Sequence, residues 1–242
     1  QKKLIKSAGG DARKMLNTLD VAVQLLGEEK EITDQIFSEA AQSKILIYDK
    51  KGDYHYDIIS AFIKSIRGSD PDAAIYWLAV MLEGGEKPEF IARRLIILAS
   101  EDIGNADPNG LIIATSAFQA VHIIGMPEAA IILGQITTYL ASAPKSNASY
   151  EAINQALDYV KENGSPSVPL HLRNAPTGLM KNLDYGKDYK YPHSYPGHFV
   201  NVNYAPGKDN TSFFKPSNQG HEKWIKERLK SLWGDRFIYE EE

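Results

Sequence analysis

The chain has 242 residues, a formal net charge of −4 at pH 7 and no cysteine. The lack of cysteine excludes disulfides, thiolate catalysis and cysteine metal sites. The acidic balance argues against a nucleic-acid binder that is held by one broad basic face. A hydrophobic content of 43% and a charged content of 24% are typical of a soluble globular protein, and we expect a cytoplasmic protein of one or two domains.

The first two predicted elements are helices over residues 11–26 and about 33–43. The first helix carries an apolar stripe formed by Leu16, Leu19, Val23 and Leu26. Arg13 lies in its first turn, where the helix dipole places roughly half a positive charge, so a cation there costs about 0.3–1 kcal/mol unless an anion lies nearby. A nucleotide phosphate is one such anion. Alternatively, Asp11 caps the helix and Arg13 extends into water.

A change of composition follows the second helix. A short apolar run at residues 45–48 leads into the polar stretch 49–53, which is typical of a linker or surface loop. We place the domain boundary there, so that residues 1–47 form a small helical domain and residues 48–242 a larger one.

Helix-starting and helix-ending residues divide the next part of the chain into a series of helices. Asp70-Pro71 and Asp107-Pro108 each combine a capping residue with a proline suited to the first helical turn. Glycines end several segments. These signals predict helices from Tyr54 to Gly68, Asp70 to Gly84, Pro88 to Gly104, Asp107 to Ala143 with a break at 125–127, and Asn147 to Gly164.

The stretch 108–143 contains a single formally charged residue, Glu128. Two helices that are hydrophobic nearly all round lie at the centre of a large domain or in a subunit interface, and the sequence does not separate these alternatives. Polar residues and the break at 125–127 leave no stretch of about 20 apolar residues, so a membrane span is not expected.

Prolines and tyrosines concentrate after Ser165. We expect residues 165–216 to form an ordered, irregular arm that lies across the helical core and has short extended pieces. Ser217 then caps a last amphipathic helix, whose apolar residues are Trp224, Ile225, Leu229 and Leu232.

The motifs of several enzyme classes are absent. The sequence has no G-x-x-x-x-G-K-[ST] loop, no dinucleotide-binding glycine pattern and no G-x-S-x-G elbow. Glu101 and Asp102 diverge by about 100° around a helix, which favours an ion-pair or capping role over acid–base catalysis. The six histidines include no pair at metal-ligand spacing, so no metal is expected, and we expect His193 and His198 to pack with tyrosines.

Cations that are candidates for DNA contacts lie in the linker, in the helix that starts at Pro88 and in the last helix. The last helix carries Lys223, Lys226, Arg228 and Lys230. These alternate with Glu222 and Glu227, and the spacing favours i,i+4 ion pairs over a track for phosphates. The DNA-binding candidates are therefore Lys50, Lys51, Arg93 and Arg94.

Two stretches resemble known proteins. Residues 10–17 read Gly-Asp-x-Arg-x-x-Leu-Asn, which resembles the sensor-2 helix that opens the lid of AAA+ ATPases. Residues 93–108 read RRLIILASEDIGNADP. This run resembles the R-R-L-x-x-x-A-S-E-D-I-G-x-A-D-P signature of the replication-associated recombination protein A family (RarA, also called MgsA), AAA+ ATPases similar to clamp loaders. Further stretches similar to that family are residues 54–57, 139–141, 144–147, 168–174 and 190–193.

The resemblance implies an all-α fold, with a lid remnant, a multi-helix domain like a clamp-loader collar, an irregular arm and a final helix. It implies that the longer protein forms homotetramers through this helical region, binds DNA, hydrolyses ATP with Mg and acts at stalled replication forks. A single-stranded DNA-binding protein is a compatible further partner. In the family the sensor-2 arginine touches the γ-phosphate, a role that falls here to Arg13.

The chain starts at Gln1 within a helical pattern and contains no P-loop. We therefore expect the ATPase core to lie upstream, and the fragment alone to need no cofactor and to hydrolyse no ATP. Two other classes stay open. A stand-alone α-helical module would bind a protein or DNA through the tyrosine-rich arm, with salt-sensitive affinity for single-stranded DNA. An unrecognised enzyme would need a polar cleft that gathers several histidines and carboxylates.

Overall fold

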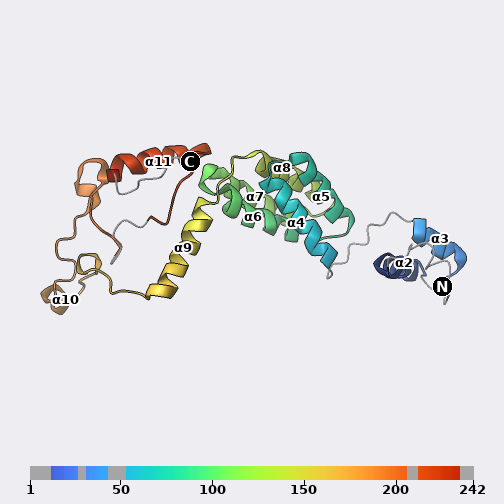
Figure 1. The fold of residues 1–242 in the computed structure, drawn as a ribbon, viewed down its shortest axis with the longest axis horizontal. Helices are drawn as coiled ribbons and strands as arrows, with labels where there is room; N and C mark the ends of the chain where they lie inside the picture. The colour runs from blue at the N-terminus through green and yellow to red at the C-terminus, as the bar shows by residue number, and fades with distance from the viewer. Residues whose placement is uncertain (1–11, 27–30, 43–52, 206–211, 235–242) are drawn as a thin grey trace. The chain divides into compact units, whose positions relative to one another are not determined.

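The computed structural model describes residues 12–26, 31–42, 53–205 and 212–234. Every regular element in these ranges is a helix (Figure 1), which confirms the all-α fold class. The chain divides into two compact units, residues 1–92 with 120–141 and residues 93–119 with 142–242. The expected boundary near residue 48 lies outside the described ranges and stays a prediction.

The first unit begins with a helix pair, α2 (Ala12–Leu25) and α3 (Asp34–Gln42). The pair packs through a small cluster of buried residues, Val21, Ala22 and Ala40. The apolar stripe expected on α2 is therefore not the face that packs, because most of it is exposed: Leu16, Leu19 and Val23. This correction leaves an apolar side of α2 uncovered, since one partner helix covers only one side.

The core of the first unit is built from α4 (Asp53–Arg67), α5 (Pro71–Glu83) and α8 (Ala129–Ser142). α4 packs along α5, and Ile75 of α5 contacts α8 at Gly134. As predicted, Asp70 caps α5 by accepting a hydrogen bond from the Ala73 N–H at 2.9 Å. The fully buried side chains, each worth about 1.5–3 kcal/mol, include Ile58, Phe62, Ile66, Met81, Leu133, Ile136 and Leu140.

The division between the units falls within α6 (Pro88–Leu98) and α7 (Asn109–Ile124). The helix expected from Pro88 to Gly104 ends as an α-helix at Leu98. It continues as a π-helical turn, η1 (Ala99–Ile103), and a 3-10 turn, η2 (Gly104–Ala106). The Gly104 N–H donates to the Ala99 carbonyl, which is the wider hydrogen-bond pattern of a π turn.

The second unit places α9 (Ala148–Asn163) and α11 (Gly220–Trp233) against η2. The prediction that Ser217 caps the last helix is wrong, because Gln219 occupies the N-cap position. The Ser217 Oγ instead accepts a hydrogen bond from the Gln219 N–H at 3.1 Å, so it shapes the approach to the helix.

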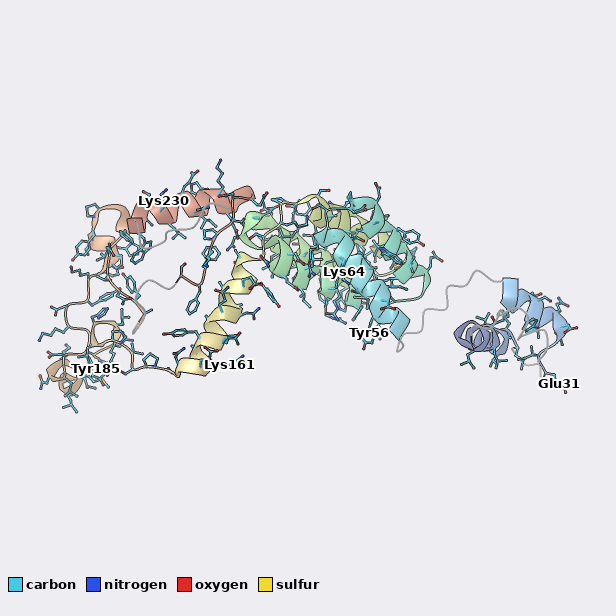
Figure 2. All side chains as sticks on the ribbon, viewed as in Figure 1. Glu31, Tyr56, Lys64, Lys161, Tyr185 and Lys230 are labelled. Carbon is cyan, nitrogen blue, oxygen red and sulfur yellow. The ribbon has the colours of Figure 1, made fainter. Side chains whose placement is uncertain are left out.

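The arm after α9 contains a short helix, α10 (Gly178–Asn182), and three 3-10 turns: η3 (Leu170–Leu172), η4 (Pro192–Ser194) and η5 (Pro196–His198). Arg173 organises its first half by donating from Nε to the Val168 carbonyl at 2.6 Å and by lying 5.1 Å from the Tyr185 ring centroid. Figure 2 labels Tyr185. As expected, His193 packs on Tyr191, with ring centroids 5.2 Å apart.

The arm buries few of its own residues, and its expected place across the helical core stays a prediction. Within residues 165–205 a single residue, Val200, is buried. The end of this stretch contacts α11 through aromatic rings, with the Phe199 and Trp233 centroids 4.9 Å apart. Local hydrogen bonds and turns, rather than burial, therefore order most of these residues.

Candidate functional site

Arg13 is the second residue of α2, and the first turn of that helix contains no acidic residue. The sequence therefore places a cation at the positive end of the helix dipole, as predicted, without an acidic neighbour in that turn. Its contact with a phosphate stays a prediction, and Asp11 lies outside the described residues.

The predicted DNA-binding cations do not form one described surface. Arg93 and Arg94 are consecutive on α6, where neighbouring side chains diverge by about 100°. Arg93 is exposed, whereas Arg94 is half-buried with its Nε in the interior. Lys50 and Lys51 lie outside the described residues. The DNA-binding role of all four stays a prediction.

The stretch 99–106, which we call the 99–106 turn, is closely packed against residues 144–146. Gly104 adopts a φ of +52°, and a Cβ there would lie 2.9 Å from the Ser146 carbonyl oxygen. The Ser146 N–H donates to the Asp102 carbonyl at 2.8 Å. Only glycine combines this backbone angle with such a close approach.

Glu222 of α11 ties the last helix to this turn. It is fully buried, and its Oε2 accepts hydrogen bonds from the Ser146 Oγ and from the Ser217 N–H, each at 2.7 Å. Gly220 lies so close to the Ala106 carbonyl and to Pro144 that a Cβ would collide with both. α11 is therefore anchored on the 99–106 turn by a buried carboxylate and by backbone contact.

Lys145 adds a partly buried cation beside the anchor. Its Nζ donates to the Ala143 carbonyl at 2.6 Å. Burial lowers the pKa of Lys145, and the negative charge of Asp102 opposes that shift. Asp102 is itself buried, which favours the structural role expected for it over acid–base catalysis.

The sequence reasoning missed Glu222 and assigned it to a surface ion pair. The one available signal is its seven-residue spacing from Leu229, which puts it on the apolar side of α11. The anchor joins segments that are far apart in the sequence, and its chemistry is that of a structural link. Within the described ranges no group of three or more metal-ligating side chains occurs.

α9 presents an apolar stripe to solvent. The exposed fractions are 44% for Tyr150, 55% for Ile153, 51% for Leu157 and 52% for Val160, and no residue of α9 is buried. The half-buried residues of α9 are Ala148, Ser149, Ala152, Asn154, Ala156 and Tyr159, whose ring packs on Phe213 with centroids 5.8 Å apart. Apart from Tyr159, the large apolar side chains of α9 face solvent, whereas in the usual amphipathic pattern they face the protein.

The first unit also exposes large apolar side chains near the α7–α8 connection. Ile123 is 80% exposed and Ile131 is 74% exposed. Of the two interpretations that the sequence left open for these helices, the buried Leu133, Ile136 and Leu140 put one side of α8 at the centre of the unit, and a subunit interface at the exposed isoleucines stays a prediction.

Two family models match the chain. The model described as the C-terminal part of the MgsA AAA+ ATPase matches residues 68–233, and a model described as an AAA C-terminal domain matches residues 1–67. The chain belongs to the MgsA AAA+ ATPase family.

Named relatives agree with this assignment to the MgsA family. The replication-associated recombination protein A of Coxiella burnetii is 44% identical over 95% of the chain and 53% of its own length. The Escherichia coli K12 protein of that name is 40% identical over 92% of the chain and 51% of its own length. The ATPase WRNIP1 of Dictyostelium discoideum is 42% identical over 80% of the chain and 24% of its length.

The chain thus spans about half the length of these bacterial MgsA-family relatives. Among the helices in the described ranges, none has both the length and the apolar content that a membrane crossing requires.

Proposed function

We propose that the chain is the C-terminal part of a DNA-dependent AAA+ ATPase that maintains replication forks and acts in recombination and repair. In this proposal the upstream core binds ATP and Mg, Arg13 acts as its sensor-2 arginine, and the helical region holds a homotetramer together. The protein works in the cytoplasm at the nucleoid, with a single-stranded DNA-binding protein among its partners. The names of the bacterial relatives and their greater length support this interpretation.

The outward stripe of α9 is the observation that carries the assembly. Its four residues follow a 3-4-3 spacing, which is the a/d pattern of helices that pair with other helices. The stripe is self-complementary when two copies run antiparallel, because Tyr150 then faces Val160 and Ile153 faces Leu157. We therefore assign α9 of a second copy as the occupant of the stripe.

The energy of this pairing indicates that a second surface is needed. Eight half-exposed side chains, at about 1.5–3 kcal/mol for a fully buried one, gain about 6–12 kcal/mol. Association itself costs about 4–15 kcal/mol. A tetramer with two-fold symmetry needs more than one kind of interface, and the exposed Ile123 and Ile131 supply further apolar area.

Size-exclusion chromatography with light scattering measures the mass of the assembled chain and so tests the homotetramer. The wild-type chain should give a tetramer. Leu157→Glu places a charge in the middle of the stripe and should give a smaller species. Gln155→Glu adds the same charge on another, exposed side of α9 and should leave the tetramer intact. A wild-type chain that stays monomeric at high concentration would contradict the proposal, as would equal masses for the two variants.

The role of Arg13 is tested in the protein that includes the upstream core. Arg13→Ala should lower ATP turnover, because the cation facing the γ-phosphate is removed. Lys14→Ala removes the neighbouring cation and serves as the control. If Arg13→Ala leaves turnover unchanged, the sensor-2 role is refuted.

A further inference from the structure

The solvent-exposed half of α11 carries cations along one edge and an aromatic row along the other. We propose that this half, formed by His221, Lys223, Trp224, Arg228 and Lys230 and called the α11 face, binds single-stranded DNA. Bases stack on its rings and phosphates contact its cations. The inference rests on the proposed DNA-dependent function and assigns a place in this chain where the DNA is held.

Because Glu222 is buried, the exposed surface of α11 carries more positive than negative side chains. The sequence suggested that Glu222 and Glu227 neutralise the cations around them, but Glu222 is buried: its Oε2 accepts hydrogen bonds from Ser146 and Ser217, and its Oε1 has no hydrogen-bond partner among the described residues. Four cations of α11, Lys223, Lys226, Arg228 and Lys230, are left with one carboxylate outside the interior, Glu227. Lys226 donates to Asn218 at 3.0 Å rather than to Glu222.

The remaining cations are available to a ligand. Within the part of the chain that the structure describes, Lys223 and Lys230 form no ion pair, and both are exposed. They are seven residues apart and so lie in one row along the helix. Figure 2 labels Lys230 on α11. Two exposed ammonium groups about 10.5 Å apart along one row suit phosphates of a nucleic-acid backbone that are not immediate neighbours.

An aromatic row lies about 100° or more around α11 from the lysines, and the exposed Glu227 lies between the two rows. The rings of His221 and Trp224 are stacked, with centroids 5.1 Å apart and planes 20° apart. The guanidinium carbon of Arg228 lies 5.9 Å from the Trp224 ring. Trp224 nevertheless remains 54% exposed. The sequence placed this indole on the buried side of the last helix, so its exposure is a correction.

The combination of exposed rings and exposed cations on the α11 face favours single-stranded over double-stranded DNA. Stacking on an aromatic ring requires an unpaired base, and it tolerates any sequence because every base has a flat face. His221 and Arg228 already lie against the indole, so a base stacks on Trp224 by displacing one of them. The Glu222 anchor fixes α11 on the 99–106 turn, so the helix itself is ordered before a ligand binds.

The test uses the 242-residue chain and a fluorescein-labelled oligothymidine of about 20 nucleotides, long enough for one site of this class. Fluorescence anisotropy measures the dissociation constant over salt concentrations from about 50 to 200 mM. Trp224→Ala should weaken binding about tenfold, and Trp224→Phe should restore most of it. Circular dichroism verifies that each variant keeps the helical content of the wild type.

The lysines are tested by the salt dependence. Lys223→Gln with Lys230→Gln should reduce the slope of log K against log salt by about 1.4, or 0.7 for each phosphate of a single strand that the variant no longer neutralises. The matched control is Lys161→Gln with Lys187→Gln, which removes two exposed lysines that are paired with Asp158 and Asp184. This control should leave the slope close to that of the wild type.

Three results would overturn the inference. The first is a wild-type chain that does not bind the oligonucleotide, and the second is α11-face variants that bind like the control. The third is a polyglutamate peptide that binds more tightly than the oligonucleotide and depends on Trp224, since the face would then dock an acidic protein. The light-scattering and ATP-turnover experiments do not involve this face, so they decide the proposed function separately.

Discussion

The left-handed conformation of Gly104 lets the backbone of Ser146 approach the 99–106 turn. A side chain at this position would meet two separate penalties, one from the positive φ and one from the close carbonyl of Ser146. Gly164, which ends α9, also has a positive φ of +71°, but no atom lies within 4 Å of its would-be Cβ. Comparing substitutions at Gly104 and Gly164 therefore separates the cost of backbone strain from the cost of steric contact.

Gly104→Ala should destabilise the chain more than Gly164→Ala. The left-handed angle costs both variants about 1–2 kcal/mol, and Gly104→Ala should be destabilised by a further 1–3 kcal/mol, about the cost of overpacking. Urea denaturation of both variants and of the wild type gives the free energies of unfolding. Equal losses of stability would show that the contact with Ser146 is not tight in solution.

Lys145 makes a pH-dependent contribution to stability. Burial lowers its pKa in the folded state below the ordinary value of 10.5. Between the folded pKa and 10.5 the unfolded chain binds more protons, so this group makes stability rise with pH across that window. Below the folded pKa the cost of burying the charge is present in full.

Replacing Lys145 by Gln removes this dependence. The free energy of unfolding of Lys145→Gln relative to wild type should be most favourable near neutral pH and should decline as the pH approaches 10.5. Urea denaturation of both proteins at a series of alkaline pH values measures the difference. A difference that stays constant with pH would mean that burial does not lower the pKa of Lys145.

At the scale of elements, α11 is held by one buried carboxylate rather than by a large apolar face. Glu222→Ala leaves the Ser146 hydroxyl and the Ser217 N–H without their acceptor, which should cost about 1–3 kcal/mol. Glu227→Ala removes an exposed carboxylate from the same helix and should stay within about 0.5 kcal/mol of wild type. Urea denaturation compares the two.

A second readout locates the effect of Glu222→Ala. Hydrogen exchange should show faster exchange of the α11 amides, while those of α4 and α5 stay protected, because local openings follow structural units. Equal protection of α11 in the two variants would argue against the anchor.

The elements that the sequence predicts well carry their signals locally. Asp70 and Pro71 define the start of α5 without help from the rest of the chain. The burial of Glu222 depends on Ser146, which is distant in sequence, and the local pattern offers only the seven-residue spacing from Leu229 as a signal. Trp224 was misplaced for a related reason: the helical period marks an apolar side, but tertiary contacts decide which residues of α11 it covers.

The candidate sites divide in the same way. Family motifs place Arg13 at a helix start and Arg93 on a helix, because such motifs are local. The sequence underestimates the positive charge of the α11 face, because a charge pattern alone does not show that Glu222 is buried. The net charge of such a surface becomes known only when the structure shows which side chains are exposed.

For the whole molecule, assembly and stability should be linked. Each unit exposes large apolar side chains, Ile123 and Ile131 in one and the α9 stripe in the other. An oligomer that buries these residues stabilises the folded chain by mass action, since the unfolded chain does not associate.

The thermal midpoint of the wild-type chain should therefore rise with protein concentration. For a chain of this size, a tenfold increase should raise the midpoint by about 2–4 °C. Leu157→Glu should abolish most of this dependence because the α9 stripe no longer pairs, while Gln155→Glu should retain it. Calorimetry over a concentration series measures all three proteins. If the thermal midpoint of the wild type does not change with concentration, the chain stays monomeric and the α9 stripe does not pair.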